Sequence, residues 1–195
     1  MAYEQLQQHI GRRVSLTEEE LAEFCSFFKP AKIKKRQFII QPGFVARHRF
    51  YTVQGAFRAY VIGDAGEEHT IQFAVDDWWI TDYNSYIFQQ PATMFVMALE
   101  DSTVLQIDHE SEQQLKAAHH KFETFFRILA EGTAAYMARR VITNLTKTAE
   151  QRYLQFLEQY PHVAAKVPQY ALASFLGMTT EYLSKLRNKR TGRKS

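Results

Sequence analysis

The chain has 195 residues, a formal net charge of +3 and 46% hydrophobic residues, which is enough apolar material for one or two folded domains. It has neither an apolar run of about 18 residues nor a charged and apolar leader, so we expect no membrane spanning, no secretion and a cytoplasmic location. We expect disorder at the two ends only.

A single cysteine, Cys25, excludes an internal disulfide. Its apolar neighbours Leu21, Phe24 and Phe28 predict a core position, with a redox role as the alternative. These neighbours belong to an amphipathic helix predicted over residues 16–28, which Thr17 is placed to cap.

Short β-rich runs follow between residues 31 and 109, separated by glycine-containing turns. The runs cover residues 38–40, 50–53, 57–62, 69–73 and 94–107. Their length and spacing predict an antiparallel barrel or roll, and residues 1–110 are assigned to this first domain.

A long helical region is predicted next, over residues 111–145. Six apolar side chains that share one side of it are candidates for dimerisation: Phe122, Phe126, Leu129, Tyr136, Met137 and Val141. Such a helix is too apolar to stand alone. It packs on the barrel, on a second copy of itself, or on both, and a purely intramolecular core helix is the alternative.

Residues 146–195 are assigned to a third domain. A helix over residues 149–160 follows a hinge at 145–148 and ends at Pro161. Near Pro168 a second helix begins, with Ala173 as the small residue where two helices cross, and Gly177 ends it. Thr179 or Thr180 then caps a third helix over about 180–188.

This pattern predicts a helix-turn-helix that binds double-stranded DNA. Tyr182, Leu183 and Leu186 are expected to face inward. The residues expected to face DNA are Thr179, Thr180, Glu181, Ser184, Lys185, Arg187, Asn188, Lys189 and Arg190. From residue 146 onward there are nine Lys or Arg and three Glu, so this end carries +6 and the remainder −3. Such segregation favours phosphate binding, and a solvated basic tail is the alternative.

In this order of parts, the chain resembles the Crp/Fnr family of transcriptional regulators over nearly its whole length. The resemblance rests on Gln54-Gly55, Phe57 to Tyr60, Gly66 and Phe73 in the roll, on the run 149–153, and on the segments 167–169 and 176–187. It implies an α+β fold with an N-terminal antiparallel β-roll (a jelly-roll barrel with flanking helices), a long dimerisation helix and a C-terminal helix-turn-helix domain. It also implies a homodimer whose last helix enters the major groove, and RNA polymerase as a further partner.

Two features depart from that family. Where its cyclic-nucleotide cassette has Gly-Glu and Arg-Ser/Thr, this chain has Thr81-Asp82 and Ala92-Thr93, and no Lys or Arg lies between His69 and His109. A buried phosphodiester would lack a cation there, so we expect no response to cyclic AMP. The chain also leaves little room for a β-hairpin wing after the last helix, and Lys189, Arg190, Arg193 and Lys194 are expected to contact the DNA backbone instead.

Aromatic residues in the same part of the roll make a candidate pocket for a small apolar or cationic effector. The pocket would comprise Trp78, Trp79, Asp82, Tyr83, Tyr86 and Thr93. The alternative is that these rings fill the barrel.

An enzyme is not expected, because the seven histidines show no metal-ligand spacing and there is no nucleophile elbow or phosphate loop. No metal or cofactor is expected. The rival function is a small-molecule sensor whose output is not DNA binding.

Overall fold

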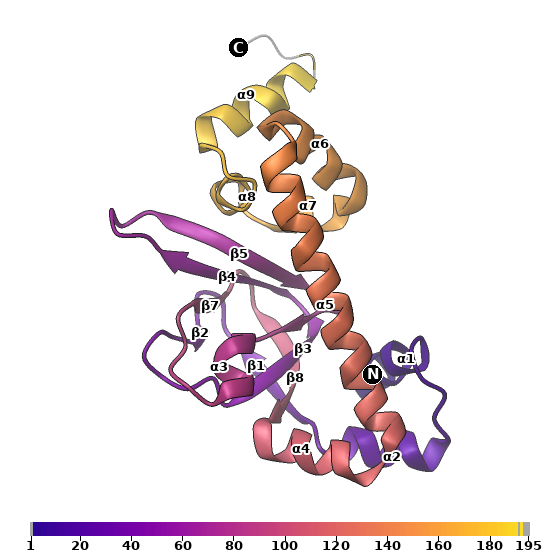
Figure 1. Cartoon of the computed structure of the whole chain (residues 1–195). Helices are drawn as coiled ribbons and strands as arrows, with labels where there is room; N and C mark the ends of the chain where they lie inside the picture. Colours follow the sequence, from indigo (N-terminus) through magenta and orange to yellow (C-terminus); the bar gives the residue numbers. More distant parts are fainter. Residues whose placement is uncertain (1, 191, 193–195) are drawn as a thin grey trace.

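The computed structural model describes residues 2–190 and 192, without the side chain of Arg190. A β-roll forms the body, a long helix runs along one side of it, and a group of short helices lies at the far end of that helix (Figure 1). Among the described helices, none is both long and apolar enough to span a membrane.

The roll consists of two four-stranded antiparallel sheets. One has the order β1-β8-β3-β6, with β1 Lys29–Ile33, β8 Ser102–Asp108, β3 His48–Gln54 and β6 Trp79–Ile80. The other has the order β2-β7-β4-β5, with β2 Phe38–Ile40, β7 Phe95–Ala98, β4 Ala56–Ile62 and β5 Glu68–Val75. The predicted antiparallel roll is confirmed. The run expected at 94–107 is two strands, because residues 99–101 turn the chain.

Two strands and a helix in the roll were not predicted. β1 reads as polar because it is an edge strand with exposed Lys29 and Lys32, a pattern that prevents edge-to-edge pairing with other chains. β6 has two residues, and α3 (Tyr83–Phe88) is a short helix capped by Asp82. Segments this short carry little periodic signal.

Close packing inside the roll explains Gly55, which joins β3 to β4 at a φ of +125°. A Cβ atom at this position would lie 2.1 Å from the Oγ of Ser102 and 2.9 Å from its Cα. No L side chain fits there, so the sharp reversal between these strands requires glycine.

Two helices precede the roll. The predicted helix is α2 (Glu18–Ser26), with a capping box in which Thr17 and Glu20 bond reciprocally. Cys25 is buried, and burial raises the pKa of its thiol to about 11, so its core position is confirmed. The expectation of a disordered N-terminus was wrong: α1 (Ala2–Gly11) buries Leu6 and Ile10 completely.

The long helical region begins earlier than predicted and has two parts. α4 (His109–Ala118) is followed, after a break at His119, by α5 (His120–Thr146). Phe122 and Phe126 pack into a core with Phe24 on α2. The structure therefore contradicts their assignment to a dimer interface, because both side chains are at most 3% exposed within one chain.

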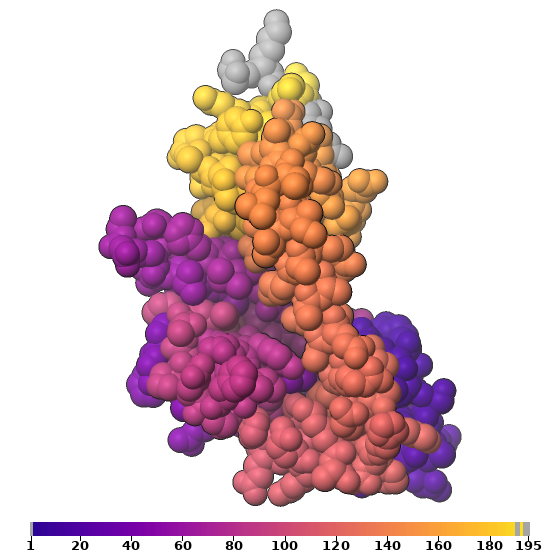
Figure 2. All heavy atoms as spheres, in the orientation of Figure 1, coloured from indigo at the N-terminus to yellow at the C-terminus, as the bar shows by residue number. Residues whose placement is uncertain are grey.

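The C-terminal helices are α6 (Ala149–Gln159), α7 (Pro161–Lys166), α8 (Gln169–Phe175) and α9 (Thr180–Arg190). The hinge is residues 147–148, and Thr148 opens α6 with a second capping box, to Gln151. The short α7 was not predicted. These helices share one core with the roll, in which Phe73 of β5 contacts Phe175 of α8. The space-filling view shows the β4–β5 region directly below the C-terminal helices (Figure 2).

Candidate nucleic-acid interface and effector cavity

The turn between α8 and α9 has the predicted geometry. Gly177 adopts a φ of +65°, its amide donates to Ser174 O, and the Met178 amide donates to Ala173 O. These two bonds define the motif by which a glycine ends a helix. The Thr179 hydroxyl then accepts from the Tyr182 amide and starts α9, which decides between the two predicted caps.

One face of α9 packs inward and the opposite face is open. Leu183 and Leu186 are buried in the core shared with α6 and α8. With 100° between successive residues, the side chains opposite them are Glu181, Ser184, Lys185 and Asn188. Glu181 and Lys185 are exposed, and the other two are partly exposed.

Two predicted residues flank this open face and contact neighbouring helices. Arg187 Nη1 lies 3.5 Å from Gln169 Oε1 on α8, and Lys189 Nζ lies 3.1 Å from Glu150 Oε1 on α6. Thr180 is exposed, and its backbone carbonyl accepts from the side-chain amide of Gln169. The Arg190 side chain, Arg193 and Lys194 lie outside the described residues.

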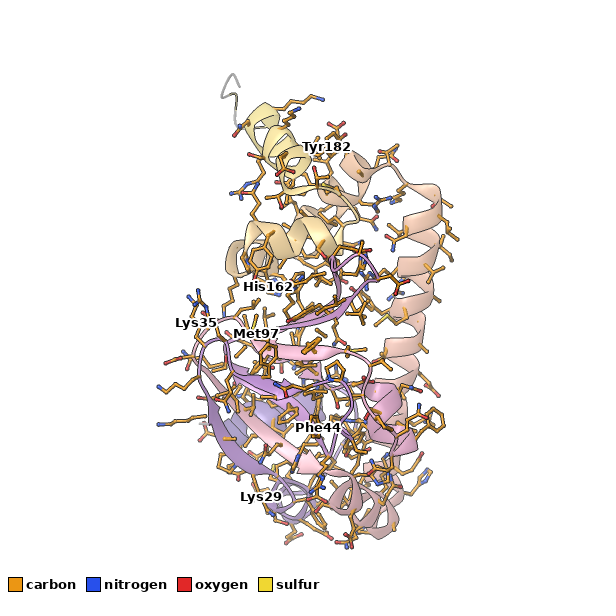
Figure 3. The ribbon with its side chains drawn as sticks, turned by 90° about the vertical axis from the view of Figure 1, so that its left-hand side faces the viewer. Lys29, Lys35, Phe44, Met97, His162 and Tyr182 are labelled. Atoms are coloured by element: carbon orange, nitrogen blue, oxygen red, sulfur yellow. The ribbon has the colours of Figure 1, made fainter. Side chains whose placement is uncertain are left out.

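The inward orientation predicted for Tyr182 was wrong. Its side chain is 42% exposed, at the end of the molecule away from the strands (Figure 3). On α9 it lies on the same side as Lys185 and Lys189, because residues spaced by three or four positions are neighbours on the surface of a helix. Sequence reasoning also missed Gln169, whose position at the start of α8 is next to α9 only in the folded chain.

The roll holds the helix-turn-helix through direct contacts with β5. The Ser174 hydroxyl accepts from the Thr70 amide at 2.8 Å and donates to Glu68 O at 2.6 Å. The Arg140 guanidinium of α5 donates to Thr70 O and Ile71 O. At the other edge of the contact Trp78 packs against Tyr160 and His162, and Figure 3 places His162 where the C-terminal helices meet the strands.

The six residues predicted to form an effector pocket do not all lie around one cavity. Tyr86 is fully buried and donates to Glu112 on α4. Asp82 is 1% exposed, and its two carboxylate oxygens accept from the Ser85 and Thr93 amides. Of the six, only Trp78, Trp79 and Tyr83 line a common cavity.

That cavity has a volume of about 230 Å³ and lies between the roll, α1 and α5. Arg49 of β3 lines it with a side chain only 5% exposed, and Arg13, in the turn after α1, also lines it. Strand β3 thus brings a cation to this cavity from a distant part of the sequence, whereas the segment between His69 and His109 supplies none, as predicted. Arg49 Nε is, however, 3.2 Å from the fully buried Glu112 carboxylate.

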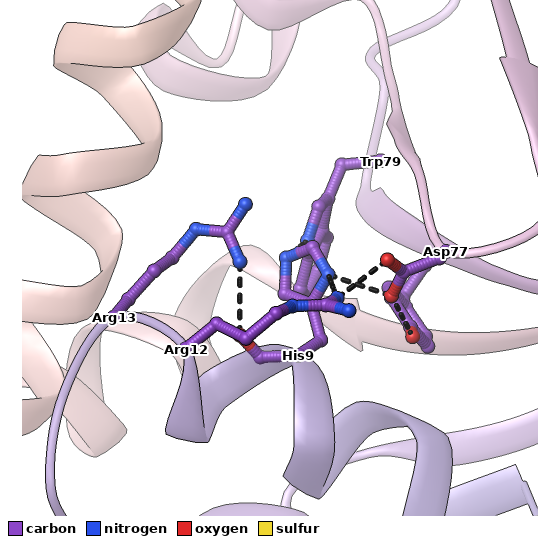
Figure 4. Close-up of polar contacts among 6 residues, drawn as sticks. His9, Arg12, Arg13, Asp77 and Trp79 are labelled. Atoms are coloured by element: carbon purple, nitrogen blue, oxygen red, sulfur yellow. Dashed lines mark hydrogen bonds and ion pairs between the residues drawn. The ribbon is translucent and has the colours of Figure 1, made fainter.

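A hydrogen-bond network around His9 closes the cavity on the α1 side (Figure 4). Trp79 Nε1 donates to His9 Nε2 at 3.0 Å, and His9 Nδ1 lies 2.8 Å from Asp77 Oδ1. Because an indole nitrogen only donates, Nε2 accepts and Nδ1 carries the proton that is donated to Asp77. Asp77 also accepts from Arg12 and from the Tyr51 hydroxyl. Burial and the bond from Trp79 keep His9 neutral, and the network fixes α1 to the roll.

The segment in the place of the nucleotide cassette is occupied by the protein's own bonds. Thr81 donates to His48 O, and Asp82 caps α3. Ala92 is buried, in the place where an arginine would be needed, and Thr93 is exposed. No side chain of this segment offers a cation to a phosphate.

The comparisons with known proteins agree with this architecture. Residues 30–119 match the family model of the cyclic nucleotide-binding domain. FixK2 from Bradyrhizobium japonicum superposes with a TM-score of 0.74 at 16% identity, over 85% of this chain and 86% of that one. The chain has a Crp/Fnr-like fold.

Other solved structures support this Crp/Fnr-like fold. A CooA mutant from Carboxydothermus hydrogenoformans gives a TM-score of 0.68 at 19% identity, over 92% of this chain and 87% of that one. The c-di-GMP responsive global regulator CLP of Xanthomonas campestris gives 0.67 at 14% identity, over 90% and 92%. No curated protein sequence matches the chain. The likeness is therefore one of fold across both the roll and the C-terminal helices.

Proposed function

We propose that this Crp/Fnr-like chain is a sequence-specific DNA-binding transcriptional regulator that acts as a homodimer and is not an enzyme. The observation that carries the proposal is the open face of α9, on which Glu181, Ser184, Lys185 and Asn188 lie opposite the buried Leu183 and Leu186. A helix presented in this way, on the +6 end of the chain, fits a major groove. The regulators among the superposed structures support it.

Each side chain on the open face has a chemistry suited to bases. Lys185 donates to the O6 and N7 acceptors of guanine, and Glu181 accepts from the N4 amino group of cytosine. Ser184 serves either a base or a phosphate. Lys189, at the flank and 74% exposed, is placed for a phosphate.

Selection of binding sites from random DNA, with purified ligand-free protein, tests this function. We expect enrichment of a two-fold symmetric site, and loss of that enrichment when residues 149–195 are deleted. A folded dimer that enriches no sequence would contradict effector-independent binding and favour a sensor whose roll must first bind a ligand.

The dimer is proposed to form through an apolar stripe on the second half of α5. Ala134, Ala138, Val141 and Leu145 recur at the spacing of a coiled-coil seam and are exposed; Val141 is 57% and Leu145 81% exposed. Of the residues predicted from sequence, only Val141 lies on this stripe. Leu129 packs on the core of the N-terminal helices, and Tyr136 and Met137 point elsewhere and are half-buried.

Analytical ultracentrifugation tests the stripe. Replacing Val141 and Leu145 by Asp is expected to convert a dimer into a monomer, because the charges would be buried in the seam. Leu154→Asp is the matched control, since Leu154 is 48% exposed on α6 and outside the stripe. A dimer that survives the double change would refute this interface.

Cyclic AMP is not expected to bind the roll. Ala92 is buried where the cassette would need an arginine, and no Lys or Arg lies between His69 and His109. Arg49 is already paired with the buried carboxylate of Glu112, which also pairs with Lys116. Calorimetry with cyclic AMP checks this, and micromolar affinity would overturn it.

A further inference from the structure

A second cavity lies at the hinge, between α5 and the C-terminal helices, and has a volume of about 210 Å³. Its walls come from three helices and the residues that end them: residues between Tyr136 and Asn144 on α5, residues between Arg152 and Gln159 on α6 with the following Tyr160, and Phe175 of α8 with the following Leu176. It is thus distinct from the cavity beside Trp79, with which it shares no residue.

The charge of the hinge cavity is unbalanced. Arg139, Arg140 and Arg152 line it, and none of the residues that the structure places in its walls is acidic. In the roll cavity, by contrast, Asp77 and Glu112 accompany the arginines. Three guanidinium groups without a carboxylate create a positive potential that favours an anion.

Two of the three guanidinium groups contact only backbone carbonyls and rings. Arg140 donates to Thr70 O, Ile71 O and Phe175 O, and its guanidinium carbon lies 4.1 Å from the centroid of the Phe175 ring. Arg152 Nε donates to Leu176 O at 2.9 Å, and Nη1 donates to Lys147 O at 2.8 Å. Carbonyl dipoles orient these side chains but leave their net charge uncompensated.

The third guanidinium is free to bind. Arg139 is exposed and makes no hydrogen bond or ion pair with any part of the chain that the structure describes. Arg152 Nη2 makes no hydrogen bond there either. Asn144, Gln155 and Gln159 add side-chain amides to the walls.

Aromatic walls and size define the rest of the ligand. Tyr136, Phe156, Tyr160 and Phe175 line the cavity with flat apolar surfaces. An apolar cavity of about 150 Å³ accommodates benzene, so about 210 Å³ accommodates one ring with a charged substituent. Guanidinium groups bind planar carboxylates through paired hydrogen bonds.

We propose that the hinge cavity binds a small organic anion with a flat apolar body, of the class of single-ring aromatic carboxylates. Arg139 and Arg152 hold the carboxylate, and the aromatic walls hold the ring. The ligand then bridges α5 and α6 next to Leu176, the last residue before the turn that leads to α9. Tyr136, Arg140 and Thr143 lie on the face of α5 opposite the stripe of Ala138 and Leu145, so a dimer leaves the cavity accessible.

Isothermal titration calorimetry and amide chemical shifts of the full-length protein, with sodium benzoate as the probe, test this site without any DNA. We expect one saturable site per chain with a Kd of about 1 mM or tighter. The side-chain amides of Gln155 and Gln159 are expected to shift on binding. Arg139→Gln is expected to weaken binding about tenfold. Arg47→Gln, which removes an exposed charge on the roll, is the matched control and leaves binding unchanged.

Two further probes separate charge from shape. Benzyl alcohol has the ring without the charge, inorganic phosphate has the charge without the ring, and both are expected to bind at least about tenfold more weakly than benzoate. The proposal is overturned if benzoate does not saturate by about 20 mM, if benzyl alcohol binds equally well, or if Arg139→Gln and Arg47→Gln have the same effect. Because no DNA is present, these outcomes are independent of whether α9 binds an operator.

Discussion

His9 shows how one residue connects burial, protonation and stability. Its imidazole is 3% exposed, between Trp79 and Asp77. Burial is the main cause, and the charge of Arg13 the second, that lowers the pKa of His9 to about 4. Protonation would place a new N–H on Nε2 against the Trp79 N–H, two donors face to face. The folded protein therefore favours the neutral ring.

This lowered pKa predicts a pH dependence of stability. In the unfolded chain His9 takes up a proton near pH 6.5, whereas in the folded chain it does so only near pH 4. The stability contributed by the neutral ring is complete above pH 6.5 and is lost as the pH falls toward 4. We expect urea unfolding to show a loss of about 2 kcal/mol between pH 7 and 5 that His9→Gln lacks.

The control for the His9 prediction is His69→Gln, because the His69 side chain is 54% exposed. That variant is expected to keep the full wild-type pH dependence. If His9→Gln and the wild type lose equal stability between the two pH values, His9 is not the group responsible.

Variants of Lys185 and Lys189 distinguish base recognition from phosphate binding. Lys185 lies on the open face of α9, and Lys189 lies at its flank beside Glu150. Lys185→Ala is expected to weaken binding to the cognate DNA site by about 1 to 3 kcal/mol and to relax the sequence preference of the protein. Lys189→Ala is expected to weaken binding to all DNA sequences alike. It is also expected to reduce the slope of log binding constant against log salt concentration by about 1. Binding assays at several salt concentrations measure both, and identical behaviour of the two variants would contradict the division.

At the scale of elements, the α8–α9 turn depends on its local backbone more than on side-chain packing. A Cβ atom at Gly177 would meet nothing closer than Arg152 Nη2, at 3.6 Å. The reason for glycine here is its φ of +65°, which other L residues adopt at a cost. The turn that leads from α8 into α9 therefore requires this dihedral angle.

Two glycine-to-alanine changes test that reasoning. Gly177→Ala is expected to destabilise the protein by about 1 to 2 kcal/mol, because alanine is forced into the left-handed region. Gly132→Ala, in the interior of α5 with nothing within 4 Å of an added Cβ, is expected to stabilise it by about 0.5 to 1 kcal/mol. Urea unfolding measures both, and changes of the same sign would refute the account.

At the scale of the whole molecule, the roll and the C-terminal helices are joined through a common core. Phe73 and Val75 of β5 belong to the same apolar cluster as Phe156, Leu172 and Leu183. A three-part division of the chain describes its architecture, but this cluster crosses the boundary between the first and third parts. The orientation of α9 is therefore set against the roll as well as by its own turn.

Arg140 is the test of that joint core. We expect one cooperative unfolding transition, with tryptophan fluorescence and far-UV circular dichroism coinciding, because Trp78, one of the two tryptophans, lies at the junction. Arg140→Gln is expected to lower the free energy of unfolding by about 1 to 3 kcal/mol, since it takes the donors away from three backbone carbonyls.

Arg139→Gln makes the same change of charge one position earlier and is expected to change the free energy of unfolding by less than about 0.5 kcal/mol. Two separate transitions in the wild type, or equal effects of the two variants, would show that the roll and the C-terminal helices are not coupled in this way.

The sequence by itself determined the features that depend on neighbours along the chain. The cap at Thr17, a threonine cap at position 179 or 180, the left-handed Gly177 and the order of roll, long helix and helix-turn-helix follow from patterns within a few residues of each other. The α1 helix and the short strand β6 escaped detection because their stabilising contacts lie on other elements.

Only the tertiary structure decided which residues meet across long separations. It brought Arg49 to the cavity wall, turned Tyr182 outward, placed Phe122 in the core of one chain and gathered Arg139 and Arg152 around the hinge. Apolar and basic side chains have the same spacing whether they face their own core, a partner or a ligand. Which surface covers each of them depends on the packing of whole elements, and local periodicity does not contain that information.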